Sequence, residues 1–224
     1  MLSDALSYPI EGDQWIGRLV VGGLLVLASP LVVPAIVLQG YFVAVIRSAT
    51  AGESTAPPFE DWERLLVDGL KAVVIALGYA LVPAVVLLVV FGLVGFGTSL
   101  AAAGGSDAGV GIGVVTLLAL TGLTILLSLV VAYLIPAALS RFAIEESLGA
   151  AFDVRAVIAA ATTGAYATGW LLSAVIAIVV GAAGSSLTIL LIGFAVAFYG
   201  QVASTYCFAR GYAEATGDAV PSAR

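Results

Sequence analysis

The chain has 224 residues, of which 62% are apolar and only 10% are charged. Ordinary soluble domains are about 45–50% apolar and about 25% charged, so this composition excludes a soluble globule and predicts an integral membrane protein. The net charge of −6 disfavours a nucleic-acid partner, because phosphate binding needs a basic surface. The chain has no histidine and one cysteine, Cys207, so it lacks the commonest general base and metal ligand and cannot form a cysteine metal cluster. We therefore expect no cofactor, no bound metal and no enzymatic activity.

Residues 1–13 are predicted to form a cytoplasmic or interfacial segment, whose charges are all acidic, unlike the basic start of a secretory signal. The following apolar run, Trp15 to Ile46, is too long for one ordinary membrane-spanning helix. Because it contains Ser29-Pro30, we predict a tight hairpin with spans at 14–28 and 31–46. A single bent helix is the alternative.

Four more apolar runs follow, and each is long enough to cross a bilayer. They predict spans at 69–94, 110–139, 164–180 and 187–209. A stretch rich in Gly, Ala and Ser at 95–109 is expected to be a loop, and 181–186 a turn. The membrane bundle thus extends over 14–209 and is followed by a polar cytoplasmic tail at 210–224.

The basic residues test the six-span topology. All eight fall on the side of the two termini: Arg18, Arg47, Arg64, Lys71, Arg141, Arg155, Arg210 and Arg224. The three opposite connections contain none. By the positive-inside rule, this asymmetry predicts a multi-pass protein of the cell membrane with both termini in the cytoplasm.

A weak internal repeat suggests how the spans are grouped. Tyr8 to Arg18, Pro58 to Arg64 and Ala151 to Arg155 each combine an apolar or aromatic residue, an acid and an arginine, and each precedes a pair of spans. We infer short cytoplasmic interfacial helices at about 58–68 and 147–163. The predicted fold is an all-α polytopic membrane bundle of six spans, arranged as three tandem helical hairpins.

The interfacial helix at 58–68 is the clearest candidate for a partner-docking surface. Its apolar residues fall at helical spacing on one side, and its charges fall on the other. The candidate docking residues are Phe59, Glu60, Asp61, Trp62, Glu63 and Arg64. The alternative is that this helix only anchors the bundle at the level of the lipid headgroups.

Part of this region resembles a known family. The residues Gly40-Tyr41, Arg47, Gly52-Glu53, Pro58 to Trp62 and Asp68 to Lys71 are similar to the signature of the domain-of-unknown-function 4013 family of archaeal membrane proteins. The resemblance extends over roughly Tyr8 to Tyr212. It implies an archaeal, often halophilic, multi-span protein, which agrees with the acidic, lysine-poor composition, and it implies no known activity.

The predicted spans contain neutral polar residues but no ionisable residue near their middle. Gln39, Tyr133 and Gln201 are the candidate residues of an intramembrane polar site, although hydrogen bonds between helices are the simpler explanation. Small residues at Gly193, Ala197, Gly200 and Ser204 form one face of the last span, which we expect to pack within the bundle or, alternatively, to form a homo-oligomer contact.

These features favour a non-catalytic scaffold or assembly subunit of a membrane complex, with the lipid bilayer and a cytoplasmic or membrane protein as its partners. A transporter or channel for a small neutral solute or lipid is the first alternative. A membrane enzyme without a recognisable motif is the second.

Overall fold

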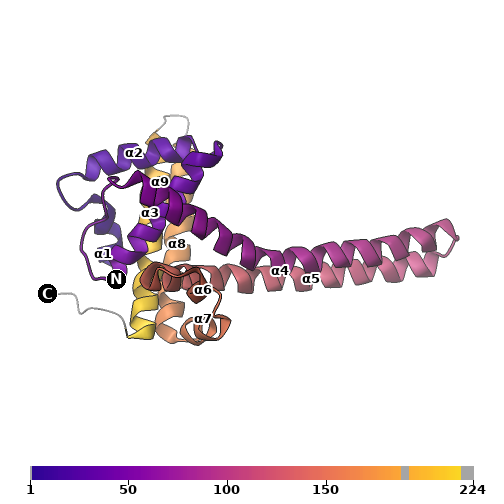
Figure 1. Cartoon of the computed structure of the whole chain (residues 1–224). Coiled ribbons are helices and arrows are strands. Elements are labelled where there is room, and N and C mark those ends of the chain that lie inside the picture. The colour runs from indigo at the N-terminus through magenta and orange to yellow at the C-terminus, as the bar shows by residue number, and fades with distance from the viewer. Residues whose placement is uncertain (1, 188–191, 218–224) are drawn as a thin grey trace. The chain divides into compact units, whose positions relative to one another are not determined.

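The computed structural model describes residues 2–187 and 192–217, which form helices and turns and contain no strand. These residues belong to two compact units: a larger unit within Met1–Ile75 and Pro136–Arg224, and a hairpin unit of Ala76–Ile135. The helices in Figure 1 are α1 (Leu2–Ser7), η1 (Tyr8–Ile10), α2 (Trp15–Leu27), α3 (Val32–Thr50), α4 (Trp62–Ala103), α5 (Asp107–Glu145), α6 (Leu148–Ala151), α7 (Val154–Ala161), α8 (Gly164–Ser186) and α9 (Ile192–Thr216).

The larger unit is organised around α9. Helix α8 packs along α9, and α2 and α3 pack on α9 as well (Figure 1). The core between these helices contains Tyr41 of α3, Tyr166 of α8 and Phe198 of α9, all of which are fully buried. Burial of such large aromatic side chains stabilises a fold in water by several kcal/mol. In a bilayer, close packing of these side chains stabilises the helix contacts instead.

The apolar run from Trp15 to Ile46 forms two helices and not one bent helix. Helix α2 ends at Leu27, and α3 begins at Val32 after an extended Leu31. The Ser29 hydroxyl donates to the Val26 carbonyl (2.6 Å) and so satisfies one of the free carbonyls at the end of α2. Since α2 has only 13 residues, it is about 20 Å long and shorter than the hydrocarbon core of a bilayer.

Residues 58–61 of the expected interfacial helix are not helical, and its remainder forms one continuous helix, α4, with the expected span at 69–94. The sequence interpretation divided these two elements at Gly69. The structure gives this glycine another role: a Cβ atom there would lie 1.8 Å from the Ile36 carbonyl oxygen, so the absence of a side chain lets α3 cross α4 closely.

The expected loop at 95–109 is mostly helical. Helix α4 continues to Ala103 and α5 starts at Asp107, so only residues 104–106 form the turn, with Gly105 at φ +72°. Residues Gly95 and Gly97 therefore do not interrupt α4. In apolar surroundings the backbone must satisfy its own hydrogen bonds, which favours helix even in segments of weak helix propensity.

Two further boundaries differ from the sequence interpretation. The expected helix at 147–163 is two short helices, α6 and α7, and the Asp153 carboxylate caps α7 by accepting from the Ala156 N–H (3.2 Å). The expected turn at 181–186 is the last part of α8. The last expected span, 187–209, and the tail partly lie outside the described residues, and α9 continues into the tail as far as Thr216.

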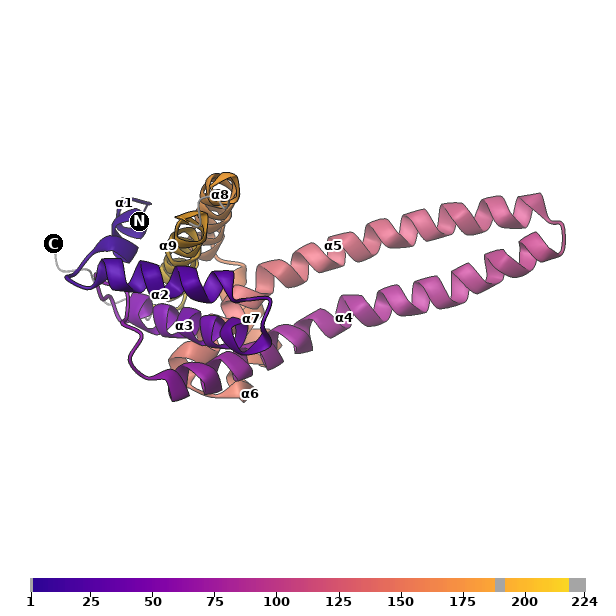
Figure 2. The same ribbon diagram turned by 90° about the horizontal axis from the view of Figure 1, so that it is seen from above.

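The hairpin unit consists of the later part of α4 and the earlier part of α5, which lie side by side in Figure 2. Most of its large apolar side chains are exposed, for example Leu88, Leu93, Ile112 and Leu118. In the described residues, α3, α4, α5, α8 and α9 are long and apolar enough to cross a membrane. This pattern is compatible with a membrane-embedded protein, because lipid replaces the missing apolar neighbours.

Candidate functional site

Charged residues of the larger unit gather where α3 ends, α4 begins and α5 ends. Arg47, in the last turns of α3, contacts Asp68 of α4, with 2.5 Å between Nη1 and Oδ2. The Nε–H of Arg47 donates to the Ala143 carbonyl of α5 (2.9 Å). Asp68 is only 5% exposed. The two hydrogen bonds of Arg47 together join α3 to α4 and to α5, and the bond to Asp68 is buried and charge-assisted.

A second arginine extends this network toward solvent. Arg64 contacts Asp68 (3.7 Å) and, through Nη2, the Oε1 atom of Glu146 (2.5 Å). Glu146 occupies the corner after α5 and has a φ of +53°, in the left-handed region that side chains other than glycine rarely adopt. The network therefore fixes the corner between α5 and α6 against the start of α4.

The candidate docking segment is held on the larger unit by aromatic stacking. Phe59 stacks on Tyr41 with 4.0 Å between ring centroids, and Phe198 lies 5.9 Å from Phe59. The Tyr41 hydroxyl donates to the Pro57 carbonyl (2.9 Å). The connection between α3 and α4 is therefore held by side-chain contacts, although it contains no regular secondary structure.

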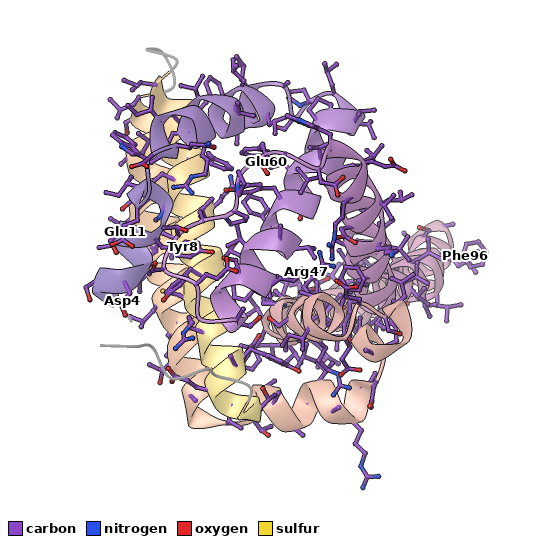
Figure 3. All side chains as sticks on the ribbon, turned by 60° about the vertical axis from the view of Figure 1, so that its left-hand side comes forward. Asp4, Tyr8, Glu11, Arg47, Glu60 and Phe96 are labelled. Carbon is purple, nitrogen blue, oxygen red and sulfur yellow. The ribbon has the colours of Figure 1, made fainter. Side chains whose placement is uncertain are left out.

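The six candidate docking residues divide into a packed group and an exposed group. Phe59 is packed as described above, Asp61 accepts from the backbone N–H of Arg64 (3.0 Å) at the start of α4, and Arg64 belongs to the charged network. Glu60 and Glu63 are exposed, and Trp62 is 46% exposed despite its size. The surface available to a partner is therefore Glu60, Trp62 and Glu63, which we call the acidic–tryptophan patch; Figure 3 labels Glu60 on it.

Sequence reasoning missed a buried hydrogen-bonded chain. The Tyr8 hydroxyl donates to Ser48 Oγ (2.8 Å), which in turn donates to Glu53 Oε2 (2.6 Å). Burial raises the pKa of the Tyr8 phenol above its usual value, so Tyr8 remains a neutral donor. Glu53 also lines a polar cavity of about 590 Å³ with Asp4 and Glu11, and Figure 3 shows Asp4, Tyr8 and Glu11 near one another.

Two of the three arginines at the ends of the proposed hairpins contact acids, and the third lies at a cavity that acids line. Arg47 contacts Asp68, and Arg141 contacts Glu145 (2.6 Å) and lies 3.9 Å from Asp153. Arg210 lines the same cavity as Asp4 and Glu11. The repeat noted in the sequence contains three other arginines, Arg18, Arg64 and Arg155, and it did not predict these contacts.

The candidate intramembrane polar residues do not line any cavity described here. Gln39 on α3 and Gln201 on α9 are exposed on the larger unit, and Tyr133 belongs to the hairpin unit. The role of these residues in an intramembrane polar site therefore stays a prediction, as does the transporter alternative.

The face of small residues on α9 packs against α8 within the same chain. A Cβ added at Gly184 of α8 would lie 3.1 Å from the Gly193 carbonyl and 3.2 Å from the Ala197 nitrogen, and a Cβ at Gly200 would clash with Val180. Ser204 and Ser173 share a hydrogen bond (2.6 Å). Helix α8 of the same chain therefore contacts the face of α9 that was the candidate for a homo-oligomer contact.

Comparison with known proteins identifies a family without an assigned role. The family model described as a protein of unknown function (DUF4013) matches residues 23–191. No curated protein and no solved structure matches the chain. The match includes the start of α4 and the charged network, but it contributes no catalytic or ligand-binding residue.

Proposed function

The chain belongs to the DUF4013 family, whose function is unknown, and we propose from its geometry that it is a non-catalytic scaffold or assembly subunit of a membrane complex. The acidic–tryptophan patch docks a cytoplasmic or membrane protein partner. In this proposal the protein is a multi-pass component of an archaeal cell membrane, its six helical spans form three tandem hairpins, and both termini face the cytoplasm.

The observation that carries this proposal is a large exposed aromatic residue between two exposed acids on a rigid support. Tryptophan is enriched at protein interfaces, because its ring offers a large contact area with little loss of side-chain entropy. Trp62 is an exposed residue of this kind. Phe59 and Asp61, the two chain neighbours of Glu60, are fixed by stacking and helix capping, so little ordering is needed on binding. The expected partner presents basic side chains around an apolar pocket.

The transporter and enzyme alternatives lack such an observation. A proton- or cation-driven carrier usually has a carboxylate within its spans, and the apolar stretches 72–106 and 108–140 contain no charge. The adjacent acids Glu60 and Asp61 are exposed, which is typical of solvated surface charge.

The docking proposal can be tested by co-purification. The wild-type protein, extracted from its native membrane in a mild detergent, is expected to retain a protein partner. The double variant Glu60→Lys/Glu63→Lys is expected to lose it, because both reversals oppose a basic partner. Asp61 is left unchanged, since it caps α4.

Two further variants make this result specific. Glu214→Lys reverses an exposed acid on α9, away from the patch, and should retain the partner. Trp62→Ala should weaken binding by about 2 kcal/mol, which is typical of an interface hot spot. Equal recovery of the partner with the double variant and the wild type, or no partner with the wild type, would contradict the proposal.

A further inference from the structure

Arg18 is a buried cation without a carboxylate partner in the described chain. It lies one turn into α2 and is 7% exposed. Its Nη1 donates to the Ala56 carbonyl and its Nη2 to the Glu11 carbonyl. Its Nε is buried and has no acceptor, and Arg18 forms none of the ion pairs of the described residues.

This arrangement leaves the charge of Arg18 incompletely compensated. A guanidinium has five N–H groups, and only two of those of Arg18 have a described acceptor. Burying a cation is costly unless it is paired, and neutral carbonyls offset the charge less well than an anion does. The two carbonyls nevertheless hold the guanidinium in a defined place, which is the arrangement expected of a binding group.

A cavity of about 430 Å³ lies beside this arginine. It is lined by Gln14, Gly17 and Val21 of the α2 region and by Phe59, together with Arg18 itself. Its size falls within the range of small-ligand sites, and two of its five lining residues have apolar side chains. A ligand that fits these walls combines an anionic group with apolar atoms.

The position of the cavity favours a lipid over a water-soluble ligand. Trp15, Ile16 and Val20 of α2 are exposed apolar residues within one turn of Arg18, and the rest of α2 contains no charge. Tryptophan and arginine at the end of an apolar helix are typical of the headgroup level of a bilayer. At this level, the anion that a membrane supplies in quantity is phosphate.

We infer that Arg18 and this cavity bind the phosphate group of an anionic membrane lipid. The free N–H groups of Arg18 donate to the phosphate oxygens, for which the planar guanidinium is well suited. Gln14 offers an additional amide donor, and the adjoining part of the lipid lies against Val21 and Phe59. The cavity shares no residue with the acidic–tryptophan patch, although Phe59 also stacks on Trp62 (5.9 Å between ring centroids), and the inference does not depend on the docking proposal.

The test measures lipid binding to the full-length protein in detergent by native mass spectrometry. The probes are phosphatidylglycerol, phosphatidylcholine with the same acyl chains, and inorganic phosphate. The wild type is expected to bind phosphatidylglycerol at least about tenfold more tightly than phosphatidylcholine, because only the former carries a net negative charge. If millimolar inorganic phosphate displaces the lipid, the phosphate site is supported and its natural ligand is assigned as a free phosphate.

A cavity-filling variant separates the site from the structural role of Arg18. A Cβ added at Gly17 meets no atom within 4 Å, so Gly17→Leu should fold and fill the cavity while leaving Arg18 in place. It is expected to weaken phosphatidylglycerol binding at least about tenfold, as is Arg18→Gln. Gly92→Leu is the matched control, because Gly92 is equally unobstructed, lies in the hairpin unit, and should bind as the wild type does.

Two results would overturn the inference. One is equal affinity of the wild type and Gly17→Leu for phosphatidylglycerol. The other is equal affinity of the wild type for phosphatidylglycerol and phosphatidylcholine. If Arg18→Gln fails to fold, Gly17→Leu still tests the inference, because this variant retains every hydrogen bond of Arg18.

Discussion

Asp68 lies buried between two arginines, and its burial determines how much each ion pair contributes to stability. The Arg47–Asp68 pair is mostly shielded from solvent, with side-chain exposures of 20% and 8%, whereas the Arg64–Glu146 pair is more than half exposed at 53% and 60%. Exposed pairs contribute little because water and salt screen them, but removing one partner of a buried pair leaves an uncompensated charge. The two pairs have the same N–O distance of 2.5 Å, but they contribute differently to stability.

We expect Asp68→Ala to lower the free energy of unfolding by about 3 kcal/mol, since Arg47 then loses its closest and most buried anion and keeps only the exposed Glu146 at 3.6 Å. Arg64→Ala should lower it by only about 0.5 kcal/mol. Titration with a denaturing detergent in mixed micelles measures both values. Similar losses in the two variants would show that burial does not control these pairs.

At the scale of elements, the crossing of α3 and α4 depends on two glycines. A Cβ at Gly40 would lie 1.7 Å from the Leu65 carbonyl oxygen, and Gly69 faces the Ile36 carbonyl in the same way. The two backbones are so close that no side chain fits between them. The crossing positions the charged network, because Arg47 and Asp68 lie on the same two helices.

Gly40→Ala is expected to destabilise the protein by about 2 kcal/mol, because the helices must separate to accommodate the methyl group. It should also weaken the Arg47–Asp68 contact. Gly92→Ala meets no neighbouring atom and should be neutral or stabilising by up to about 1 kcal/mol, owing to the better helix propensity of alanine. Thermal unfolding in detergent compares the two variants, and equal behaviour would argue against the close crossing.

At the scale of the whole molecule, the short helix α2 decides the number of membrane crossings. The other five apolar helices are long enough to span, but α2 has 13 residues and is not. If α2 and its turn nevertheless complete a sixth crossing, the two termini lie on the same side. If α2 lies in the interface, the termini lie on opposite sides.

Cysteine labelling with a membrane-impermeant reagent distinguishes these arrangements. We expect Ser3→Cys and Glu214→Cys to react from the same side of sealed vesicles and Asp107→Cys from the other side. The native Cys207 is buried and should react slowly, so the wild type is the background control. Labelling of Ser3→Cys and Glu214→Cys from opposite sides would show five crossings and overturn the six-span proposal.

The amino-acid sequence by itself predicted the helical class and the approximate centre of each apolar helix. This success has a local physical cause, because a long run of apolar residues without charges satisfies its backbone only as a helix. The split of 15–46 near Ser29-Pro30 was also predictable, because the run is too long for one ordinary span and contains a Ser-Pro pair. Proline alone was not a sufficient signal, since Pro83 and Pro136 lie inside the continuous helices α4 and α5. The choice of 59–64 as a polar surface segment rested on charge spacing within a few residues.

Only the tertiary structure decided where helices end and which side chains are exposed to a partner. Gly69 permits a helix crossing and does not end a helix, because its neighbour is Ile36 of α3. Phe59 is packed while Trp62 is exposed, because Tyr41 and Phe198 cover the former. Arg18, which the sequence places only on the side of the termini, is enclosed by backbone from residues 11 and 56. In each case the outcome depends on contacts between residues distant in the chain, and local sequence patterns do not contain that information.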